Sequence, residues 1–327
     1  MLHSIIHSYL NQNQESFHGA VLVSHRGEVL YQEAFGLANR EWCIPNAIDT
    51  RFRIGSVTKS ITALGILKLV EAGQIQLDDR LVEYIPDFKE AEGITLTHLL
   101  NHTSGIGNIT MQPDFTIQSF QRRSVDELVA WIRSLPMESE LPASFSYSNS
   151  GYVLLGKIIE NVTGLTYAEF LEREIFGPAG MQDSVLESSS ILINRASGYE
   201  MSAGGELRNA SYIDMSNAYS AGGIVSTAPD LHLLNFALDE GKLLSGDTLA
   251  KLFAWDGQQP YRYGWNRART GANRPMAFHH GGINGYTASY LKLLDQGTAV
   301  FVLSNVSTML TSTLAGVIIS ALEHEMC

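Results

Sequence analysis

Apolar positions at helical spacing mark both ends of the chain. Residues 1–13 predict an amphipathic helix, because their apolar side chains recur every three to four positions. Residues 307–323 predict a closing helix whose apolar stretch, 314–322, is shorter than the roughly 20 residues that cross a bilayer. We therefore expect both terminal helices to pack on a folded core, and we expect no transmembrane segment.

Short segments rich in β-branched and aromatic residues predict strands near both ends of the chain. Residues 19–35 form a predicted hairpin with its turn at 25–28. Residues 286–294 and 298–303 predict two further strands, joined around 295–297. Strands near both termini indicate one sheet that is built from the two ends of the chain.

The centre of the chain carries helical periodicity instead. Predicted helices cover 56–71, 125–134, 151–162 and 167–174. We therefore predict an α+β fold in a single domain over 1–327. Its sheet part comprises 1–58 with 222–327, and its mostly helical part comprises 59–221.

Composition and charge exclude several classes of function. The chain of 327 residues has a formal net charge of −12, which argues against nucleic acid as a partner, because phosphate binding needs a basic surface. Its two cysteines, Cys43 and Cys327, are too few for a disulfide framework. The N-terminus lacks the pattern of a secretory signal. This predicts a cytoplasmic protein as the sequence stands, or a periplasmic or secreted one if a signal has been removed.

The segment Ser56-Val57-Thr58-Lys59 brings a candidate nucleophile next to a candidate base. At a helix start, residues three apart share a face, so Lys59 can lie beside the Ser56 hydroxyl. A serine needs a neighbouring base, and burial lowers the pKa of a lysine enough for it to serve. The helix N-terminus also directs backbone N–H groups, including that of Ser56, at a developing oxyanion. The alternative interpretation is a helix-capping serine followed by a surface lysine.

A second match to the S-x-x-K pattern, from Ser289 to Lys292, lies in a predicted strand. Residues three apart in a strand point to opposite faces, so this serine and this lysine should not meet. The pattern alone cannot identify a catalytic serine, and the secondary structure around it decides between the two matches.

The segment Tyr147-Ser148-Asn149 supplies a further candidate for proton transfer. A phenol near Ser56 can relay a proton to a leaving group, and Asn149 can hold the lysine or a substrate carbonyl. The alternative interpretation is a half-buried tyrosine in a loop before a helix. A second Y-x-N match, at 9–11, lies within the predicted N-terminal helix.

The segment His280-Gly281-Gly282 comes just before the predicted strand 286–294. Two glycines let a substrate approach the backbone closely, and the N–H of Ile283 can complete an oxyanion hole with that of Ser56. At neutral pH His280 should be largely uncharged. The pocket should therefore bind carboxylates weakly above about pH 7 and accept neutral esters or amides. The alternatives are an ordinary glycine turn with an exposed histidine and, for the neighbouring His279, no catalytic role.

Other catalytic patterns are absent from the sequence. It contains no G-x-S-x-G elbow and no G-x-x-x-x-G-K-[ST] loop. His98 and His102 lie four residues apart, as in some zinc sites, but H-E-x-x-H is missing and a third ligand is not evident. We therefore expect neither a metal nor a cofactor.

In their order along the chain, S-x-x-K, Y-x-N and H-x-G resemble the motifs of serine β-lactamases and penicillin-binding proteins. The similarity is to the branch with tyrosine in the second motif. That branch includes class C β-lactamases, D,D-carboxypeptidases, D-aminopeptidases and β-lactamase-like carboxylesterases. The resemblance covers nearly the whole chain, through the stretches at 52–56, 97–105, 147–152 and 222–227.

The resemblance implies a mainly antiparallel sheet flanked by helices, an inserted helical subdomain and an acyl-enzyme mechanism. It also implies specific roles: Ser56 as nucleophile, Lys59 and Tyr147 as acid and base, Asn149 and His280 on the substrate side. One departure is that His-Gly-Gly stands where class C β-lactamases carry Lys-Thr-Gly. This counts against β-lactamase activity more than against hydrolase activity.

The predicted function is a serine acyl hydrolase that acts on a small ester, peptide or amide through an acyl-enzyme on Ser56. The sequence leaves two subclasses open. One is a carboxylesterase, and the other is a D,D-carboxypeptidase or D-amino-acid peptidase with weak action on β-lactams. An acyltransferase shares the first half-reaction and stays an alternative. A penicillin-binding-like sensor without turnover is another, although the intact set of Ser56, Lys59 and Tyr147 argues against it. The sequence does not indicate whether the protein is a monomer or an oligomer.

Overall fold

Seven antiparallel strands form the central sheet of this computed structural model, in the order β10-β11-β12-β13-β14-β1-β2. The structure describes residues 2–12, 17–88, 92–139, 144–254, 257 and 259–325. Strand β1 (Gly19–His25) pairs with β14 (Thr298–Ser304), from Gly19 opposite Ser304 to His25 opposite Thr298. The two ends of the chain therefore build one sheet, as the strand pattern predicts.

The remaining strands of this sheet continue the antiparallel pattern on either side. Their bounds are β2 (Glu28–Phe35), β10 (Tyr261–Arg262), β11 (Trp265–Arg269), β12 (Pro275–Ile283) and β13 (Tyr286–Leu293). Three smaller sheets comprise β3 (Leu37–Asn39) with β4 (Ile44–Pro45); β5 (Phe52–Arg53), β9 (Ile224–Ser226) and β6 (Val185–Leu186); and β15 (Val306–Ser307), β7 (Tyr199–Met201) and β8 (Leu207–Asn209).

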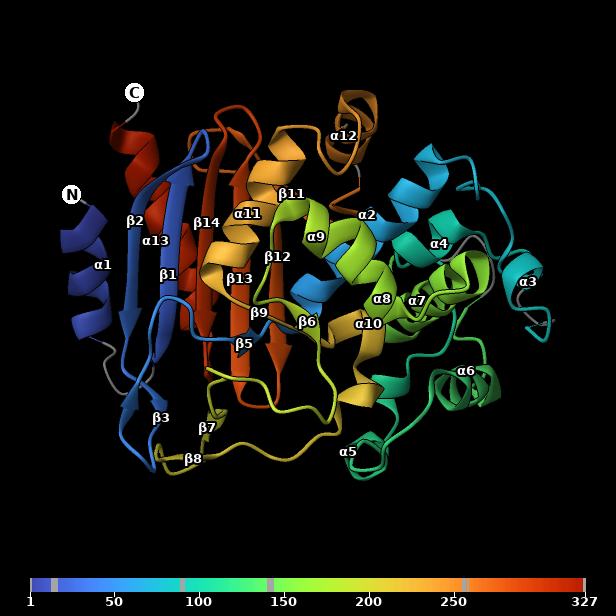
Figure 1. Cartoon of the computed structure of the whole chain (residues 1–327), viewed down its shortest axis with the longest axis horizontal. Coiled ribbons are helices and arrows are strands. Elements are labelled where there is room, and N and C mark those ends of the chain that lie inside the picture. Colours follow the sequence, from blue (N-terminus) through green and yellow to red (C-terminus); the bar gives the residue numbers. More distant parts are fainter. Residues whose placement is uncertain are drawn as a thin grey trace.

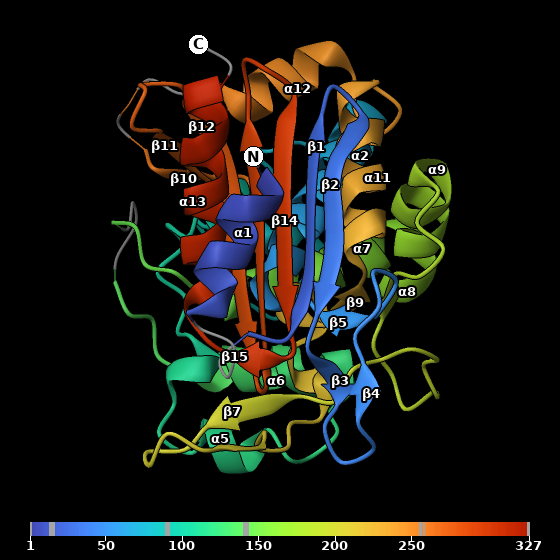
Figure 2. The same ribbon diagram turned by 90° about the vertical axis from the view of Figure 1, so that its left-hand side faces the viewer.

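Helices cover both faces of the large sheet. Figures 1 and 2 show α1 (Leu2–Asn11) and α13 (Leu310–Glu325) on one face, over strands that both ends of the chain contribute. The other face packs against α11 (Ala228–Asp239) and α2 (Thr58–Glu71), and α12 (Gly246–Phe253) lies at one end. Because successive side chains of a strand alternate, each face has its own apolar core.

The helical part of the molecule lies beyond α2, on the right in Figure 1. Its helices are α3 (Leu81–Tyr84), α4 (Leu96–Leu100), α5 (Phe115–Gln118), α6 (Val125–Ser134), α7 (Asn149–Thr163), α8 (Tyr167–Leu171), α9 (Gly177–Ala179) and α10 (Tyr219–Gly222). A π-helical turn, Glu172–Phe176, joins α8 to α9.

Local sequence signals explain where the longer of these helices begin and end. Ser124 caps α6, and Glu127 reaches back to the Ser124 N–H to complete a capping box. Ser148 caps α7 by accepting a hydrogen bond from the Gly151 N–H. Helix α7 ends at Gly164, whose φ of 71° lies in the left-handed region that glycine adopts without strain.

Several sequence-based predictions differ from the structure: helix α2 begins at Thr58 rather than at 56, and α7 spans Asn149–Thr163 rather than 151–162. The predicted closing helix begins at Leu310 rather than at 307, because Ser307 belongs to the short strand β15. The segment 275–283 carries no predicted element, yet it is the long strand β12. Residues 1 and 13 of the predicted N-terminal helix, and Cys327, lie outside the described residues. None of the helices in the described part of the chain combines the length and the apolar character that crossing a bilayer requires.

Candidate active site

Ser56 lies in a 3₁₀ turn, Gly55–Val57, that leads directly into α2. The preceding strand β5 pairs with β9, and the Ile54 N–H donates to the Ile224 carbonyl at 3.0 Å, so the approach to the turn is fixed. Gly55 adopts a φ of +50°, and a Cβ atom on it would lie 2.8 Å from the Gly282 nitrogen. Glycine is therefore required where this turn passes strand β12.

Lys59 is fully buried and points at the Ser56 hydroxyl. Its Nζ lies 3.1 Å from Ser56 Oγ, and it donates hydrogen bonds of 2.7 Å to Asn149 Oδ1 and of 2.7 Å to the Ala221 carbonyl. Burial lowers the pKa of Lys59 well below its usual value. Among the residues that the structure describes, no carboxylate forms an ion pair with Lys59 to offset this effect.

Tyr147 lies just before α7 and reaches the same serine. The Lys59 Nζ lies 4.9 Å from the centre of its ring. Burial raises the pKa of Tyr147 to about 12, although its proximity to the Ser56 hydroxyl lowers it in part. The phenol therefore keeps its proton at neutral pH. The structure thus brings Ser56, Lys59, Tyr147 and Asn149 together.

Asn149 is held from both sides at the start of α7. Its Oδ1 accepts from Lys59, and its Nδ2 donates to Thr110 Oγ1 at 2.8 Å. The backbone N–H of Asn149 donates to Asn108 Oδ1 at 3.2 Å. The amide orientation is therefore fixed, since the group that faces Lys59 must be the oxygen.

The two neighbouring histidines of β12 point to opposite faces of the sheet. A Cβ atom on Gly281 would lie 1.9 Å from the Ile54 carbonyl oxygen and 3.0 Å from the Ser56 nitrogen, so Gly281 faces the Ser56 turn. His279, two residues earlier, shares that face: its ring lies 6.4 Å from that of Tyr147, and its Nε2 lies 3.3 Å from the Tyr261 hydroxyl.

The structure places His280 away from Ser56, on the face that α1 and α13 cover. Its Nδ1 lies 2.9 Å from Ser289 Oγ, and its ring lies 5.0 Å from that of Phe278, which packs against the core of that face. The strand alternation that separates it from His279 is the physical reason. The predicted substrate-side position of His280 therefore does not agree with its placement. The residue for which we expected no catalytic role, His279, occupies that side instead.

The glycines of β12 have different surroundings. Gly281 allows the strand to approach the chain's own Ile54–Ser56 segment rather than a ligand, whereas a Cβ atom on Gly282 would meet nothing within 4 Å. The Pro275 carbonyl accepts from the Leu294 N–H next to β13. By antiparallel alternation the Gly281 and Ile283 N–H groups then point to β13, and the Gly282 N–H points to the other edge. Strand β11 pairs with β12 only as far as Phe278, so the edge at Gly282 is open towards Ser56.

An aromatic cluster supports Tyr147 from behind. The buried His102 has a φ of +58°, and its ring lies 4.3 Å from that of Tyr147 and 4.6 Å from that of Tyr261. Its Nδ1 accepts from the Ser148 N–H at 3.1 Å, and burial lowers its pKa well below the usual value. His98 instead bonds Thr95 at the start of α4, so the two histidines do not converge on one point.

A cavity of about 210 Å³ opens beside Ser56. Its lining comprises Ser56, Thr110, Phe115, Asn149, Ile213, Asn217, Ala218, Ala221, Gly222, Gly282, Ile283 and Asn284. Every one of these side chains is uncharged at neutral pH. The cavity therefore suits an uncharged group, with Phe115, Ile213 and Ile283 supplying apolar contacts.

A second cavity, of about 460 Å³, shares the lining residue Ile213 with the first, and several arginines also line it. Arg53 donates to Glu187 from Nε at 2.7 Å and from Nη2 at 2.9 Å, and Arg195 also contacts this carboxylate. Two guanidinium groups on one buried carboxylate leave an excess positive charge here.

Arg262 and Arg267 line neither of these two cavities. Arg262 stacks on Tyr263, and Arg267 donates to the carbonyls of Leu252 and Ala254.

Sequence reasoning missed Tyr261 on β10, and it missed the strand β12 that carries His279 into the site. The available signal was Asn284-Gly285, a dipeptide that favours a two-residue hairpin turn. In the structure Ile283 pairs with Tyr286 across this turn, and Gly285 has a φ of +80°. That register alone fixes which histidine faces Ser56.

The chain is similar to known proteins along most of its length. The family model described as beta-lactamase matches residues 8–320. A Bacillus subtilis protein named as a penicillin-binding protein, PbpX, is 32% identical over 256 residues, which is 76% of this chain and 62% of that protein. Esterase EstB of Burkholderia gladioli is 34% identical over 184 residues, or 50% of this chain and 46% of the esterase.

One of the similar solved structures is D-amino acid amidase of Ochrobactrum anthropi SV3, complexed with L-phenylalanine amide. It has a TM-score of 0.87 and 26% sequence identity, and the match covers 100% of this chain and 99% of that one. The chain spans less than two thirds of the length of PbpX and of the esterase. The esterase and the amidase are named for different hydrolytic activities, and PbpX is named for penicillin binding.

Proposed function

The chain belongs to the β-lactamase family, and on that premise we propose that it is a serine acyl hydrolase that works through an acyl-enzyme on Ser56. The observation that carries the proposal is the set of contacts around the Lys59 Nζ. A neutral amine has two N–H donors and one lone pair. The Ala221 carbonyl and the Asn149 Oδ1 can only accept, so they take both donors. The lone pair is then left for the Ser56 hydroxyl, 3.1 Å away.

Lys59 then serves as the general base for acylation. It takes the Ser56 proton while Oγ attacks the substrate carbonyl, and its lowered pKa keeps it neutral before the attack. Tyr147 stays protonated, with its pKa raised to about 12, and lies beside Ser56. It can pass its proton to the leaving group as the carbonyl–leaving-group bond breaks, and the proton that Lys59 took from Ser56 then replaces it on the phenol. Water attacks the acyl-enzyme in the second half-reaction, with Ser56 as the leaving group.

The oxyanion donors that fit best are the N–H groups of Ser56 and Gly282. The Gly282 N–H lies at the open edge of β12 beside the Ser56 turn, whereas the Ile283 N–H points to β13. We therefore assign this role to the N–H of Gly282 instead of that of Ile283. The Ile283 side chain lines the cavity. Two such donors account for a large share of the rate enhancement in acyl transfer, about 10²–10³-fold each.

The uncharged cavity favours neutral esters or amides as substrates. A cavity of about 210 Å³ with no carboxylate and no cation offers nothing to a free carboxylate or to an α-ammonium group. His279 does not alter this, because burial lowers its pKa to about 3 and it stays neutral. An ester with an apolar acyl group is therefore the expected substrate class.

One observation favours the alternative of a D,D-carboxypeptidase. The cavity that adjoins the first one at Ile213 carries the excess positive charge of Arg53 and Arg195 over Glu187. A longer substrate with an anionic end could reach it. Arg195→Gln should then lower kcat/KM for a carboxylate-bearing substrate and leave that of its amidated partner unchanged.

The decisive experiment is mass spectrometry of the intact protein after incubation with three acyl donors: a chromogenic ester, a D-Ala-D-Ala peptide and a penicillin. We expect a transient adduct with the ester, located on Ser56 by peptide mapping and absent in Ser56→Ala. An adduct only with the peptide would move the proposal to D,D-carboxypeptidase. An adduct that forms and never hydrolyses would indicate a sensor, and the absence of any adduct would contradict the proposal.

A further inference from the structure

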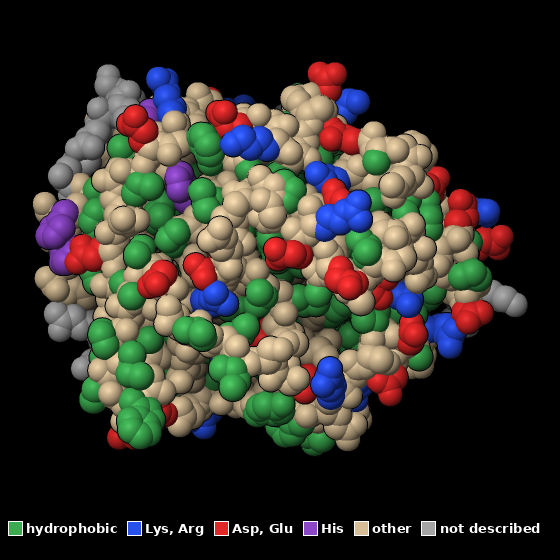
Figure 3. All heavy atoms as spheres, in the orientation of Figure 1, with side chains coloured by type: hydrophobic (Ala, Val, Ile, Leu, Met, Phe, Trp, Pro, Cys, Tyr) green, Lys and Arg blue, Asp and Glu red, His purple; other side chains and the backbone are tan. Residues whose placement is uncertain are grey.

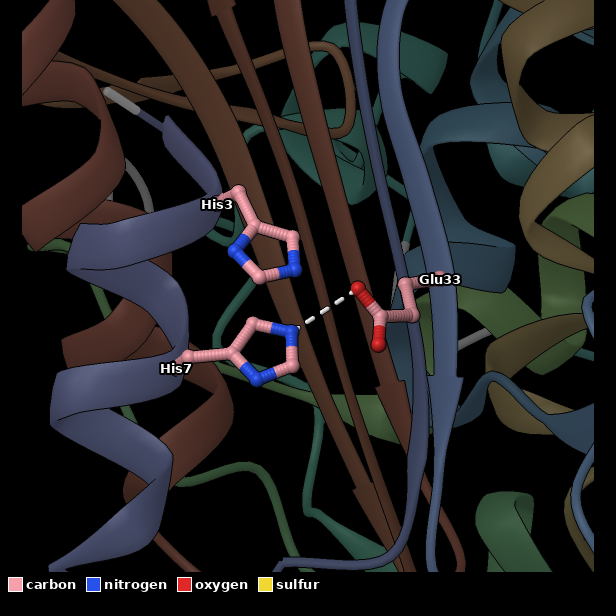
Figure 4. Close-up of side chains that lie close together, drawn as sticks. All are labelled: His3, His7 and Glu33. Atoms are coloured by element: carbon pink, nitrogen blue, oxygen red, sulfur yellow. Dashed lines mark hydrogen bonds and ion pairs between the residues drawn. The ribbon is translucent and has the colours of Figure 1, made fainter.

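Two histidines of α1 and one carboxylate of β2 meet at the edge of the large sheet, remote from the Ser56 cavity. Figure 4 shows the rings of His3 and His7 one above the other on the helix, with Glu33 facing them from the strand. The ring centroids lie 4.0 Å apart with an angle of 15° between the planes, and His7 Nε2 lies 2.9 Å from Glu33 Oε2. One ligand atom from each of the three residues lies within 4.8 Å of the others.

The sequence produces this arrangement through two periodicities. His3 and His7 are four residues apart on α1, so they share one helix face. Glu33 lies two residues from both Tyr31 and Phe35 along β2, so all three side chains share one face of the strand. The rings of Tyr31 and Phe35 pack in the apolar core under α1. Docking α1 on the sheet therefore brings the histidine face and the carboxylate together.

We propose that His3, His7 and Glu33 bind one divalent transition-metal ion, with Zn²⁺ as the expected occupant. Two imidazole nitrogens and one carboxylate oxygen are ligands that zinc prefers, whereas Ca²⁺ and Mg²⁺ take oxygen ligands. Tetrahedral bonds of about 2.0–2.1 Å require ligand atoms about 3.3 Å apart, so rotation of the side chains suffices. Water fills the fourth position, since the cluster is partly exposed.

An ion pair between His7 and Glu33 does not account for the whole cluster. It leaves His3 without a hydrogen-bonded partner among the described residues, although its ring stacks directly on that of His7. The Tyr31 hydroxyl donates to Glu33 Oε2 at 2.6 Å, and the His7 contact uses the same oxygen. Oε1 is thus open to a ligand, while Tyr31 orients the carboxylate from behind, as outer partners of metal-binding carboxylates do.

A bound ion would fasten α1 to an exposed strand. β2 is the last strand of the seven-stranded sheet, and within the described part of the chain no strand pairs with its outer edge. Unpaired edges are sites where strands of other molecules can add, so native proteins cover or restrain them. The expected role is therefore to hold the N-terminal helix in place, and the proposal does not depend on the function assigned to Ser56.

Calorimetric titration of the metal-free protein with Zn²⁺ tests the site. We expect one ion per chain, and a loss of affinity of at least about 10-fold in His3→Ala and in Glu33→Gln. Tyr31→Phe should weaken binding by about 10-fold to 100-fold, the scale for outer partners of metal ligands. His25→Ala is the matched control, because His25 bonds Thr298 outside the cluster, and it should bind as the wild type does.

Two further readouts keep the test decisive if a substitution disturbs the fold. Circular dichroism must show folded variants, and Co²⁺ absorption of the unmodified protein reports tetrahedral coordination without any substitution. A tetrahedral Co²⁺ spectrum that Zn²⁺ abolishes would support the site. Zinc binding that is unchanged in His3→Ala and Glu33→Gln, or no binding at millimolar Zn²⁺, would overturn it.

Discussion

The start of α2 and the strand β13 contain the same four-residue pattern and use it in opposite ways. In α2, Ser56 and Lys59 share a helix face, and Nζ lies 3.1 Å from Oγ. In β13, Ser289 points to His280 on one face of the sheet, and Lys292 points to Asp239 on the other. Both lysines are buried, but among the residues that the structure describes only Lys292 has a carboxylate partner. The pattern acquires chemical meaning only from the element that contains it.

The difference in partners also sets the difference in charge. Burial lowers the pKa of both lysines, but Asp239 raises that of Lys292 in part, and among the described residues no carboxylate does so for Lys59. A buried amine without a counter-ion loses its proton more readily than one that is held in an ion pair. The surroundings of the two amines therefore support the proposed role of Lys59 as a base and indicate a structural role for Lys292.

The largest expected effect separates the two serines. Ser56→Ala should reduce ester turnover by about 10⁴–10⁶-fold, because the nucleophile itself is lost. Ser289→Ala should change turnover by less than about 3-fold, since Ser289 lies on the other face of the sheet. Initial rates with a chromogenic ester, together with matching circular dichroism spectra, check both. Full activity in Ser56→Ala would contradict the assignment of the nucleophile.

The second effect separates the two lysines and includes Tyr147. Lys59→Met and Tyr147→Phe should each slow acylation by roughly 10²–10⁴-fold, the scale of general acid–base catalysis. The double variant should be little slower than the slower single one, because residues that act as a unit are non-additive. Lys292→Met should alter thermal unfolding and leave acylation nearly unchanged. Stopped-flow acylation rates measure these effects, and strict additivity would count against a shared relay.

These two pairs show how far the sequence determines the site. The residues Ser56, Lys59, Tyr147 and Asn149 are predictable, because helix starts and caps are local features that fix side-chain direction within one turn. The face of the sheet to which each β12 side chain points is not a local feature. It depends on the register with β13, and a shift of one residue moves every side chain to the other face.

The same distinction applies to the fold. The hairpin at 19–35, α6 and the strands β13 and β14 follow from their own periodicity. The sequence does not predict β12, because Met276–Gly282 has no β-branched residues and no clean alternation of apolar and polar residues. The aromatic cluster around His102 joins residues from positions 102 to 279, so only tertiary packing creates it.

The third effect is the pH dependence that a neutral Lys59 imposes. The free amine is required, so kcat/KM should fall as pH falls through the lowered pKa of Lys59, approaching 10-fold per pH unit on the acid side. This acid limb should lie below the pH at which an exposed lysine titrates, because burial lowers the pKa of Lys59. A profile of kcat/KM from pH 4.5 to 9 measures this. An enzyme that becomes active only near the pKa of an exposed lysine would contradict burial as the controlling factor.

The fourth effect concerns His279, on the Ser56 face of β12. Its buried ring lies 6.4 Å from that of Tyr147 and bonds Tyr261, so it acts as a positioning residue. His279→Asn should lower kcat/KM by roughly 10-fold to 100-fold through misplacement of Tyr147, mainly in kcat. Because the pKa of His279 is about 3, the shape of the pH profile above pH 5 should not change. A changed acid limb would instead indicate a direct role in proton transfer.

The smallest effect is expected at His280, and it sharpens the comparison most. This side chain lies on the opposite face, bonded to Ser289, and its pKa is lowered by partial burial. It therefore protonates less readily than an exposed histidine, and any charge that it gains would be separated from the cavity by the sheet. His280→Ala should change kcat/KM by less than about 3-fold. The ratio of KM values for a carboxylate-bearing substrate and its amidated partner should stay flat over this pH range, in the wild type and in the variant alike. A ratio that shifts towards the amidated substrate as pH rises, and that His280→Lys abolishes, would mean that His280 reaches the substrate. The register of β12 would then have to differ by one residue, which exchanges the faces of His279 and His280 and moves the oxyanion donor from Gly282 back to Ile283.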